Sequence, residues 1–391
     1  MPAANALLSA AELERVVPAW RARASAEGPL TPEELEQFFT EGWFVKRGLL
    51  NEAQLTEVEK DITLLIDEVV EDLRAEGRCE NGHEAQPFDT RLHAIAQDGS
   101  PDAPMRLQMK GMQHCATSAA STLSHCSSPA VSGGGLMASV RNLWSCDAML
   151  DVAEQVLGTP EIHGTPVHVL RCKTPSSAGH NVPWHQDNAY VLEEAWSKLQ
   201  LTAWVPLIDA NKENGCLELA PRGHLSGKTA THVTYPQNMW YNGLSTAEIE
   251  STLGVASSSY PLTAACDRGD VLFFSNLLPH RSTPNLSQKC RFSVDLRWQH
   301  VSEPNGMGGQ QASVLMRSKE RPKKVMRTEA WADRTIFDDL AAASSKALSA
   351  EEEVQNAAAA ARSREFGTPL GGPWIHRWWC ACCSCCMLLA C

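Results

Sequence analysis

The sequence of 391 residues lacks any apolar run near the roughly 18 residues that a membrane-spanning helix requires, so no transmembrane segment is expected. It also lacks a basic excess. With 46 acidic and 34 basic residues the formal net charge is −12, which argues against a nucleic-acid partner. The N-terminus has no basic stretch followed by an apolar core, so no secretory signal is expected either. These absences favour an intracellular, cytoplasmic protein.

Cysteine, with 14 residues, is abundant but unevenly placed. Eight cysteines are scattered between residues 79 and 290, as expected of small buried side chains rather than of a disulfide framework. The other six crowd into the end of the sequence: Cys380, Cys382, Cys383, Cys385, Cys386 and Cys391. Their overlapping Cys-x-x-Cys pairs leave three interpretations open, which are binding of a soft metal, palmitoylation with membrane anchoring through residues 380–386, and a tail without catalytic role.

Helix signals dominate the first part of the chain. Residues 1–30 are expected as a flexible N-terminal segment. Residues 31–34, Thr-Pro-Glu-Glu, form a capping pattern that begins a helix. Asn51 caps a second, long helix whose apolar stripe predicts that it covers a sheet. Residues 78–135 are rich in Ser, Gly, Pro and His and are expected as a loop insert, whereas 141–157 are expected as one helix.

Beyond residue 160 the pattern changes to short β segments separated by turns. The segments predicted as strands are 167–173, 183–187, 199–208, 216–219, 271–274 and 291–298. Many short strands favour a sandwich or barrel over a parallel α/β sheet. We therefore expect a mainly helical part over 31–160, a β core over 161–301, and an extension of helix and linker over 302–391.

A candidate metal site lies in the stretch Val182 to Tyr190. In an extended strand side chains alternate between faces, so His185 and Asp187 are expected to project from the same face. Such a mixed face is typical of divalent metals with open coordination positions, as in the facial triad of two histidines and one carboxylate. Taken alone, the pair is more often a surface hydrogen-bonding pair. A zinc site at residues 114–126, where two His-Cys pairs occur, is a weaker alternative because its spacing matches no common arrangement.

A third ligand and an anion site are suggested further along the chain. His280 follows an apolar strand and is either a metal ligand or a polar loop residue. In residues 291–298 the polar side chains alternate with apolar ones and share one face. An inward polar face costs desolvation unless it meets a polar ligand. Arg291 can bind a carboxylate through two parallel hydrogen bonds, and Ser293 can add another.

These residues together resemble the phytanoyl-CoA dioxygenase family of Fe(II)/2-oxoglutarate-dependent oxygenases. The matching stretches run in family order over roughly residues 30–300: residues 42–50, Pro183 to Asp187, residues 213–217, residues 221–224, Gly269-Asp270, His280 and Arg291. The loop insert 78–135 and the extension 302–391 lie outside the resemblance, which covers a domain over 31–301.

The resemblance implies a mainly β core, a double-stranded β-helix (a cupin-like jelly roll), with flanking α-helices. It implies Fe(II) held by His185, Asp187 and His280, with 2-oxoglutarate and O2 as cosubstrates. The distal carboxylate of 2-oxoglutarate would pair with Arg291 and Ser293, and Lys173 is a further candidate contact. The implied reaction hydroxylates an unactivated C–H bond of a small organic or acyl substrate and gives succinate and CO2. The alternative is a non-catalytic jelly-roll protein that binds a metal or ligand.

Overall fold

Capping residues begin two of the N-terminal helices as the sequence predicts. The computed structural model describes residues 9–113, 138–165, 169–176, 181–234, 241–306 and 313–325. Thr31 Oγ1 accepts the backbone N–H of Glu34 at 3.2 Å, and Asn51 Oδ1 accepts that of Gln54 at 3.0 Å. The helices of this part are α1 (Ala10–Leu13), α2 (Val16–Arg23), α3 (Pro32–Glu41) and α4 (Glu52–Ala75). The flexible segment predicted for residues 1–30 is wrong over α1 and α2, because Val16, Val17 and Trp20 of α2 are buried in the apolar core.

The insert predicted as mostly loop contains two helices, so this prediction is wrong over residues 88–97 and 103–113, and residues 114–135 lie outside the described residues. They are α5 (Phe88–Gln97) and α6 (Ala103–Gln113), and Leu92, Ile95 and Leu107 bury their side chains. Gly, Pro and Ser residues around these helices hide their pattern, and packing of α6 against α4 and β3 stabilises it in the fold. The single helix expected over 141–157 is two helices, α7 (Ala138–Ser145) and α8 (Asp147–Leu157), because Cys146 is extended between them.

The β core is one antiparallel sheet of seven strands and two small sheets. In the large sheet the order is β1-β9-β4-β11-β2-β12, and β3 also pairs with β11. Its strands are β1 (Trp43–Lys46), β2 (Ile162–Gly164), β3 (Val169–Lys173), β4 (Leu201–Pro206), β9 (Val271–Ser275), β11 (Arg291–His300) and β12 (Val314–Arg317). Strand β12 lies in the segment expected as helix and linker; its pairing with β2 places it in the sheet.

The smaller sheets and short helices complete the core. The order β10-β5-β8 forms one sheet, and β6 and β7 form the other. The strands are β5 (Leu217–Leu219), β6 (Val233–Thr234), β7 (Asn242–Gly243), β8 (Leu262–Ala264) and β10 (His280–Ser282). Helix α9 spans Thr246–Ser251, and 3-10 turns span Asp187–Tyr190, Glu193–Ala195, Gly223–Ser226, Ser257–Ser259 and Pro322–Lys324.

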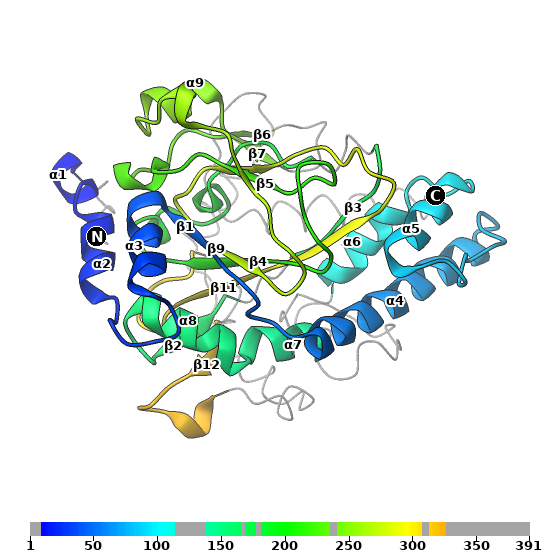
Figure 1. The fold of residues 1–391 in the computed structure, drawn as a ribbon, viewed down its shortest axis with the longest axis horizontal. Coiled ribbons are helices and arrows are strands. Elements are labelled where there is room, and N and C mark those ends of the chain that lie inside the picture. Colours follow the sequence, from blue (N-terminus) through cyan, green and yellow to red (C-terminus); the bar gives the residue numbers. More distant parts are fainter. Residues whose placement is uncertain are drawn as a thin grey trace, which may run out of the picture.

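The two faces of the large sheet have different coverings (Figure 1). Helices α4, α7 and α8 lie along one side, and a large apolar cluster joins them to residues such as Val294 and Trp298 of β11. On the other side, β5 and its neighbours lie over the sheet, and a second apolar cluster includes Trp204, Leu219 and Phe274. This arrangement is the predicted jelly roll with flanking helices. Among the described residues, no helix combines the length and apolar character needed to cross a membrane.

Candidate metal centre

The two candidate histidines are brought together by backbone pairing across the small sheet. His280 begins β10, and His185 forms an isolated antiparallel bridge with it. The His185 N–H donates to the His280 carbonyl at 3.0 Å, and the His280 N–H donates back to the His185 carbonyl at 2.9 Å. His280 is therefore placed beside His185, although 95 positions separate them in the sequence.

Asp187 does not lie on a strand with His185, so the predicted extended segment is wrong. Asp187 begins the 3-10 turn Asp187–Tyr190. The reason lies in its amide neighbours. Buried Gln186 donates to the carbonyls of Lys228 and Leu277, and buried Asn188 donates to the carbonyl of Trp196. These side chains donate hydrogen bonds to backbone carbonyls of the surrounding loops. They thereby hold residues 187–190 in a turn, and the strand predicted here does not form.

The three side chains nevertheless converge. One ligand atom of each of His185, Asp187 and His280 lies within 4.8 Å of the others, and this is the single such group in the described part of the chain. Asp187 Oδ1 lies 3.8 Å from Nε2 of each imidazole. The residues are 3%, 6% and 5% exposed. Two imidazoles and one carboxylate at this spacing fit a divalent transition metal.

Hydrogen bonds from Nδ1, on the side of each ring away from the cluster, fix the orientation of both imidazoles. Nδ1 of His185 lies 2.9 Å from the Pro183 carbonyl, and Nδ1 of His280 lies 3.0 Å from the Leu278 carbonyl. Because a carbonyl only accepts, each Nδ1 carries the proton and each Nε2 presents a lone pair to the cluster. Burial, the largest cause, lowers the pKa of both imidazoles. The neutral form, which binds metals, is thereby favoured.

The second oxygen of Asp187 is held by two residues of the large sheet. Thr202 on β4 donates to Oδ2 at 2.9 Å, and Arg297 on β11 donates through Nη2 at 3.0 Å and Nε at 3.1 Å. Burial opposes ionisation, but Arg297, both imidazoles and Thr202 outweigh it and hold the pKa of the carboxyl well below its usual range. Oδ1 is thus left for a ligand. The sequence placed Arg297 on the polar face of its strand but gave no sign of Thr202.

Arg291 and Ser293 lie together on the same face of β11. Arg291 Nη1 donates to Ser293 Oγ at 2.6 Å, and the guanidinium lies 5.3 Å from the centre of the Trp204 ring. Arg291 is 1% exposed, and its Nε has no hydrogen-bond partner among the described residues. Burial and the nearby Arg171 lower the pKa of Arg291 to about 10. A buried guanidinium with an unused donor fits an anionic ligand.

Lys173 lies opposite Arg291 in the pairing of β3 with β11. Its Nζ lies 2.8 Å from Asn181 Oδ1 and 2.9 Å from Ser282 Oγ, and it also contacts the Thr283 carbonyl. Burial, followed by Arg291 and Arg171, lowers its pKa to about 6. These three contacts occupy the Nζ group whether it is charged or neutral, because a neutral amine has two N–H donors and one lone pair.

Only some of the aromatic residues near the triad face it. Tyr190 packs edge-on against the His185 ring with centroids 5.5 Å apart. Trp184 instead packs on Tyr260, and Trp196 donates to the Val191 carbonyl. Two predictions lie outside the described residues: the weak zinc site at 114–126 and the function of the cysteine tail.

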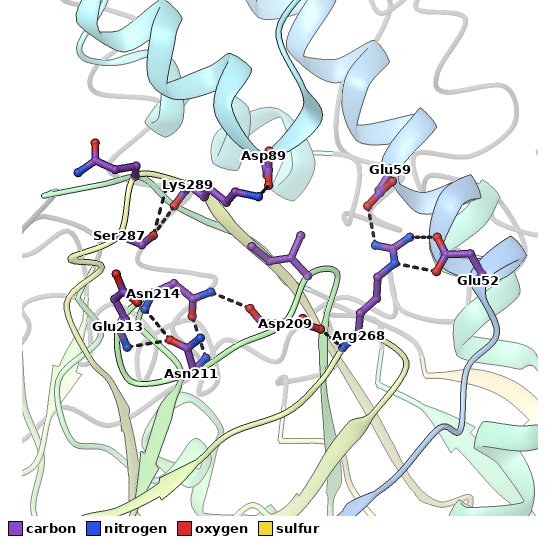
Figure 2. Close-up of a pocket in the computed structure, with 12 residues that line it drawn as sticks. Glu52, Glu59, Asp89, Asp209, Asn211, Glu213, Asn214, Arg268, Ser287 and Lys289 are labelled. Atoms are coloured by element: carbon purple, nitrogen blue, oxygen red, sulfur yellow. Dashed lines mark hydrogen bonds and ion pairs between the residues drawn. The ribbon is translucent and has the colours of Figure 1, made fainter.

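A separate pocket of about 690 Å³ lies between α4 and the turn at residues 209–214 (Figure 2). Five of its charged side chains are paired with one another. Arg268 binds Glu52 and Glu59, and Lys289 binds Asp89, as the dashed lines in Figure 2 show. None of the three triad residues lines it. This pocket is therefore not part of the candidate metal centre.

Comparison with known proteins places these residues within one family match. The sequence profile of phytanoyl-CoA dioxygenase (PhyH) matches residues 41–293. A 1-deoxypentalenic acid 11-beta-hydroxylase of Streptomyces exfoliatus is 29% identical over 177 residues, 42% of this chain and 58% of the relative. A phytanoyl-CoA dioxygenase of Arabidopsis thaliana is 29% identical over 151 residues, 38% of this chain and 47% of the relative. The match thus spans about half the length of these curated relatives.

Solved structures give weaker likenesses. The non-heme monooxygenase ThoJ in its apo form has 17% identity and a TM-score of 0.49, covering 79% of this chain and 94% of that one. EctD from S. alaskensis, solved with 2-oxoglutarate and 5-hydroxyectoine, has 16% identity and a TM-score of 0.45, covering 78% of this chain and 86% of that one. Because both TM-scores are below 0.5, the family assignment rests on the sequence match.

Proposed function

The chain belongs to the phytanoyl-CoA dioxygenase family, and from that premise we propose that it is an Fe(II)- and 2-oxoglutarate-dependent oxygenase. The observation that carries the proposal is the convergence of His185, Asp187 and His280 from separate elements, with their ligand atoms within 4.8 Å. Both imidazoles present Nε2 and the carboxylate presents Oδ1, so the donor set fits Fe(II) without rearrangement of side-chain hydrogen bonds.

The protein supplies binding and orientation, and the metal and cosubstrate supply the oxidation. With Fe(II), 2-oxoglutarate and O2 bound, the centre would oxidise a substrate C–H bond and release succinate and CO2. Pro183 and Leu278 fix the imidazoles, and Thr202 and Arg297 fix the carboxylate. Burial of all three side chains excludes bulk water from the centre.

Arg291 and Ser293 bind the distal carboxylate of 2-oxoglutarate in this proposal. Arg291 has an unused Nε donor, and its Nη1 is oriented by Ser293. The sequence suggested Lys173 as a further contact, but its Nζ is already engaged within the protein by Asn181, Ser282 and Thr283. Its proposed role is therefore to tie β3 to Asn181 and to the end of β10 at Ser282 and Thr283, rather than to contact the cosubstrate.

The proposed reaction is hydroxylation of an unactivated C–H bond in a small organic or acyl substrate. The names of the two relatives, a hydroxylase and a phytanoyl-CoA dioxygenase, support it. Asp187 supports it as well, because related halogenases lack this carboxylate and bind halide in its place.

Formation of succinate from 2-oxoglutarate by the purified protein tests the proposal. We expect turnover that requires Fe(II) and O2 and that is lost in His185→Ala. A surface variant, Arg74→Gln on α4, controls for purification and folding, because Arg74 is exposed and its one ion pair among the described residues is with Glu84. Iron binding without any O2 consumption would instead support the non-catalytic metal-binding protein.

A further inference from the structure

We propose that the substrate of this oxygenase carries a carboxylate and that Arg171 of β3 binds it. The inference rests on the proposed function, since it concerns the substrate of the same centre. Arg171 is the Cα partner of Ser293, so it shares the face of the sheet that carries Arg291, Ser293, Asp295 and Arg297. Arg297 on that face contacts Asp187. Arg171 is therefore on the side of the sheet that faces the metal centre.

The terminal nitrogens of Arg171 have no hydrogen-bond partner among the described residues. Arg171 donates through Nε to Asp295 Oδ2 at 2.9 Å, and no other hydrogen bond or ion pair of Arg171 occurs within the described ranges. A contact through Nε leaves the edge formed by Nη1 and Nη2, which is the edge that binds a carboxylate through two parallel hydrogen bonds. The side chain is 20% exposed, so a ligand can reach it.

Arg171 differs from Arg291 in its surroundings. Arg291 is enclosed, with Ser293 and the Trp204 ring against it. Arg171 lies within electrostatic range of His185, Tyr190 and Tyr241. Tyr190 packs on the His185 ring. Arg171 thus lies closer to the metal centre than Arg291 and Ser293, the residues proposed to bind the cosubstrate carboxylate. A substrate must lie near the metal centre to be oxidised.

The charges on this face leave room for one more anion. Arg171, Arg291 and Arg297 face two carboxylates, those of Asp187 and Asp295. Lys173, with a pKa of about 6, adds little charge at that pH. The charges of Fe(II) and of 2-oxoglutarate cancel each other. One positive charge remains, and a substrate carboxylate on Arg171 would balance it.

Matched pairs of ligands test the proposal on the intact protein. Aliphatic, alicyclic and aromatic monocarboxylic acids, each paired with its methyl ester, are titrated calorimetrically into the anaerobic complex with Fe(II) and 2-oxoglutarate. We expect at least one acid to bind roughly tenfold or more tightly than its ester. Arg171→Gln should weaken that acid by roughly tenfold or more, and Arg171→Lys, which keeps the charge, should weaken it less. Arg74→Gln should leave its affinity unchanged.

Two results would overturn the proposal. One is that no acid of any pair binds more tightly than its ester. The other is that Arg171→Gln weakens the binding of 2-oxoglutarate more than the binding of the acid. This result would make Arg171 a ligand of the cosubstrate, together with Arg291 and Ser293. Neither depends on turnover: absence of Fe(II)-dependent succinate formation in the wild type would instead contradict the proposed function.

Discussion

The two oxygens of the Asp187 carboxylate have different partners. Oδ1 lies 3.8 Å from both Nε2 atoms, while Oδ2 accepts bonds from Thr202 and Arg297. The bonds to Oδ2 keep the carboxylate ionised and fix the direction in which Oδ1 points. Such outer contacts commonly change metal affinity by about 10- to 100-fold when they are removed.

Thr202→Val is expected to weaken Fe(II) binding by about tenfold. Valine has the shape of threonine but cannot donate to Asp187 Oδ2, so the carboxylate loses one of its fixed contacts. Thr202→Ser keeps the hydroxyl and is the matched control. Anaerobic Fe(II) titration measures the effect. Equal affinities of the valine and serine variants would show that the hydroxyl does not orient Asp187.

The lowered pKa of Lys173 should make the stability of the protein depend on pH. Its pKa is about 6 in the folded protein and near 10.4 in an unfolded chain, so between these values the unfolded state binds more protons. The free energy of unfolding should therefore rise with pH over that window, by at most about 1.4 kcal/mol per pH unit from this group. Urea unfolding of wild type and Lys173→Met at several pH values isolates the effect. Parallel curves for the two proteins would contradict it.

Strand β11 is the element whose role the sequence predicts best. Alternation alone placed Arg291, Ser293, Asp295 and Arg297 on one face, and the pairing with β3 and β4 keeps that register. The capped starts of α3 and α4 were predicted for the same reason, because the pattern is local. The other elements depend on long-range packing, which local patterns do not reveal.

Elements that are stabilised by contacts distant in the sequence could not be predicted from local sequence patterns. Helix α6 packs on α4 and β3, and β12 is a strand only because it pairs with β2. The turn at Asp187 depends on bonds from Gln186 to loops more than 40 positions away. The proximity of His280 to His185 likewise follows from backbone pairing that no local pattern encodes; the family resemblance supplied it.

The turn between α3 and β1 should not tolerate a side chain. Gly42 has φ 90°, and an added Cβ would lie 2.7 Å from His224 Nδ1 and 2.8 Å from Leu278 Cδ1. Gly42→Ala should lower the free energy of unfolding by about 2 kcal/mol or more. Gly48 also has a positive φ, 58°, but open space around it. Gly48→Ala is the control for backbone strain alone, and denaturant unfolding that finds it equally destabilising would contradict the steric account.

The molecule as a whole carries a formal charge of −12, yet arginines outnumber carboxylates on the face that looks toward the metal centre. The fold produces this contrast by placing the polar residues of β3 and β11 inward and the helices on the opposite face of the sheet (Figure 1). An anionic cosubstrate is thereby attracted to the interior of an acidic protein.

Binding of Fe(II) to the whole protein tests the central claim most directly. Anaerobic titration should show one Fe(II) per chain in the wild type, and His185→Ala, Asp187→Ala and His280→Ala should each abolish or greatly weaken that binding while the proteins remain folded by circular dichroism. Binding of Fe(II) with undiminished affinity and the same stoichiometry in all three variants would contradict the assignment of these residues as the metal centre.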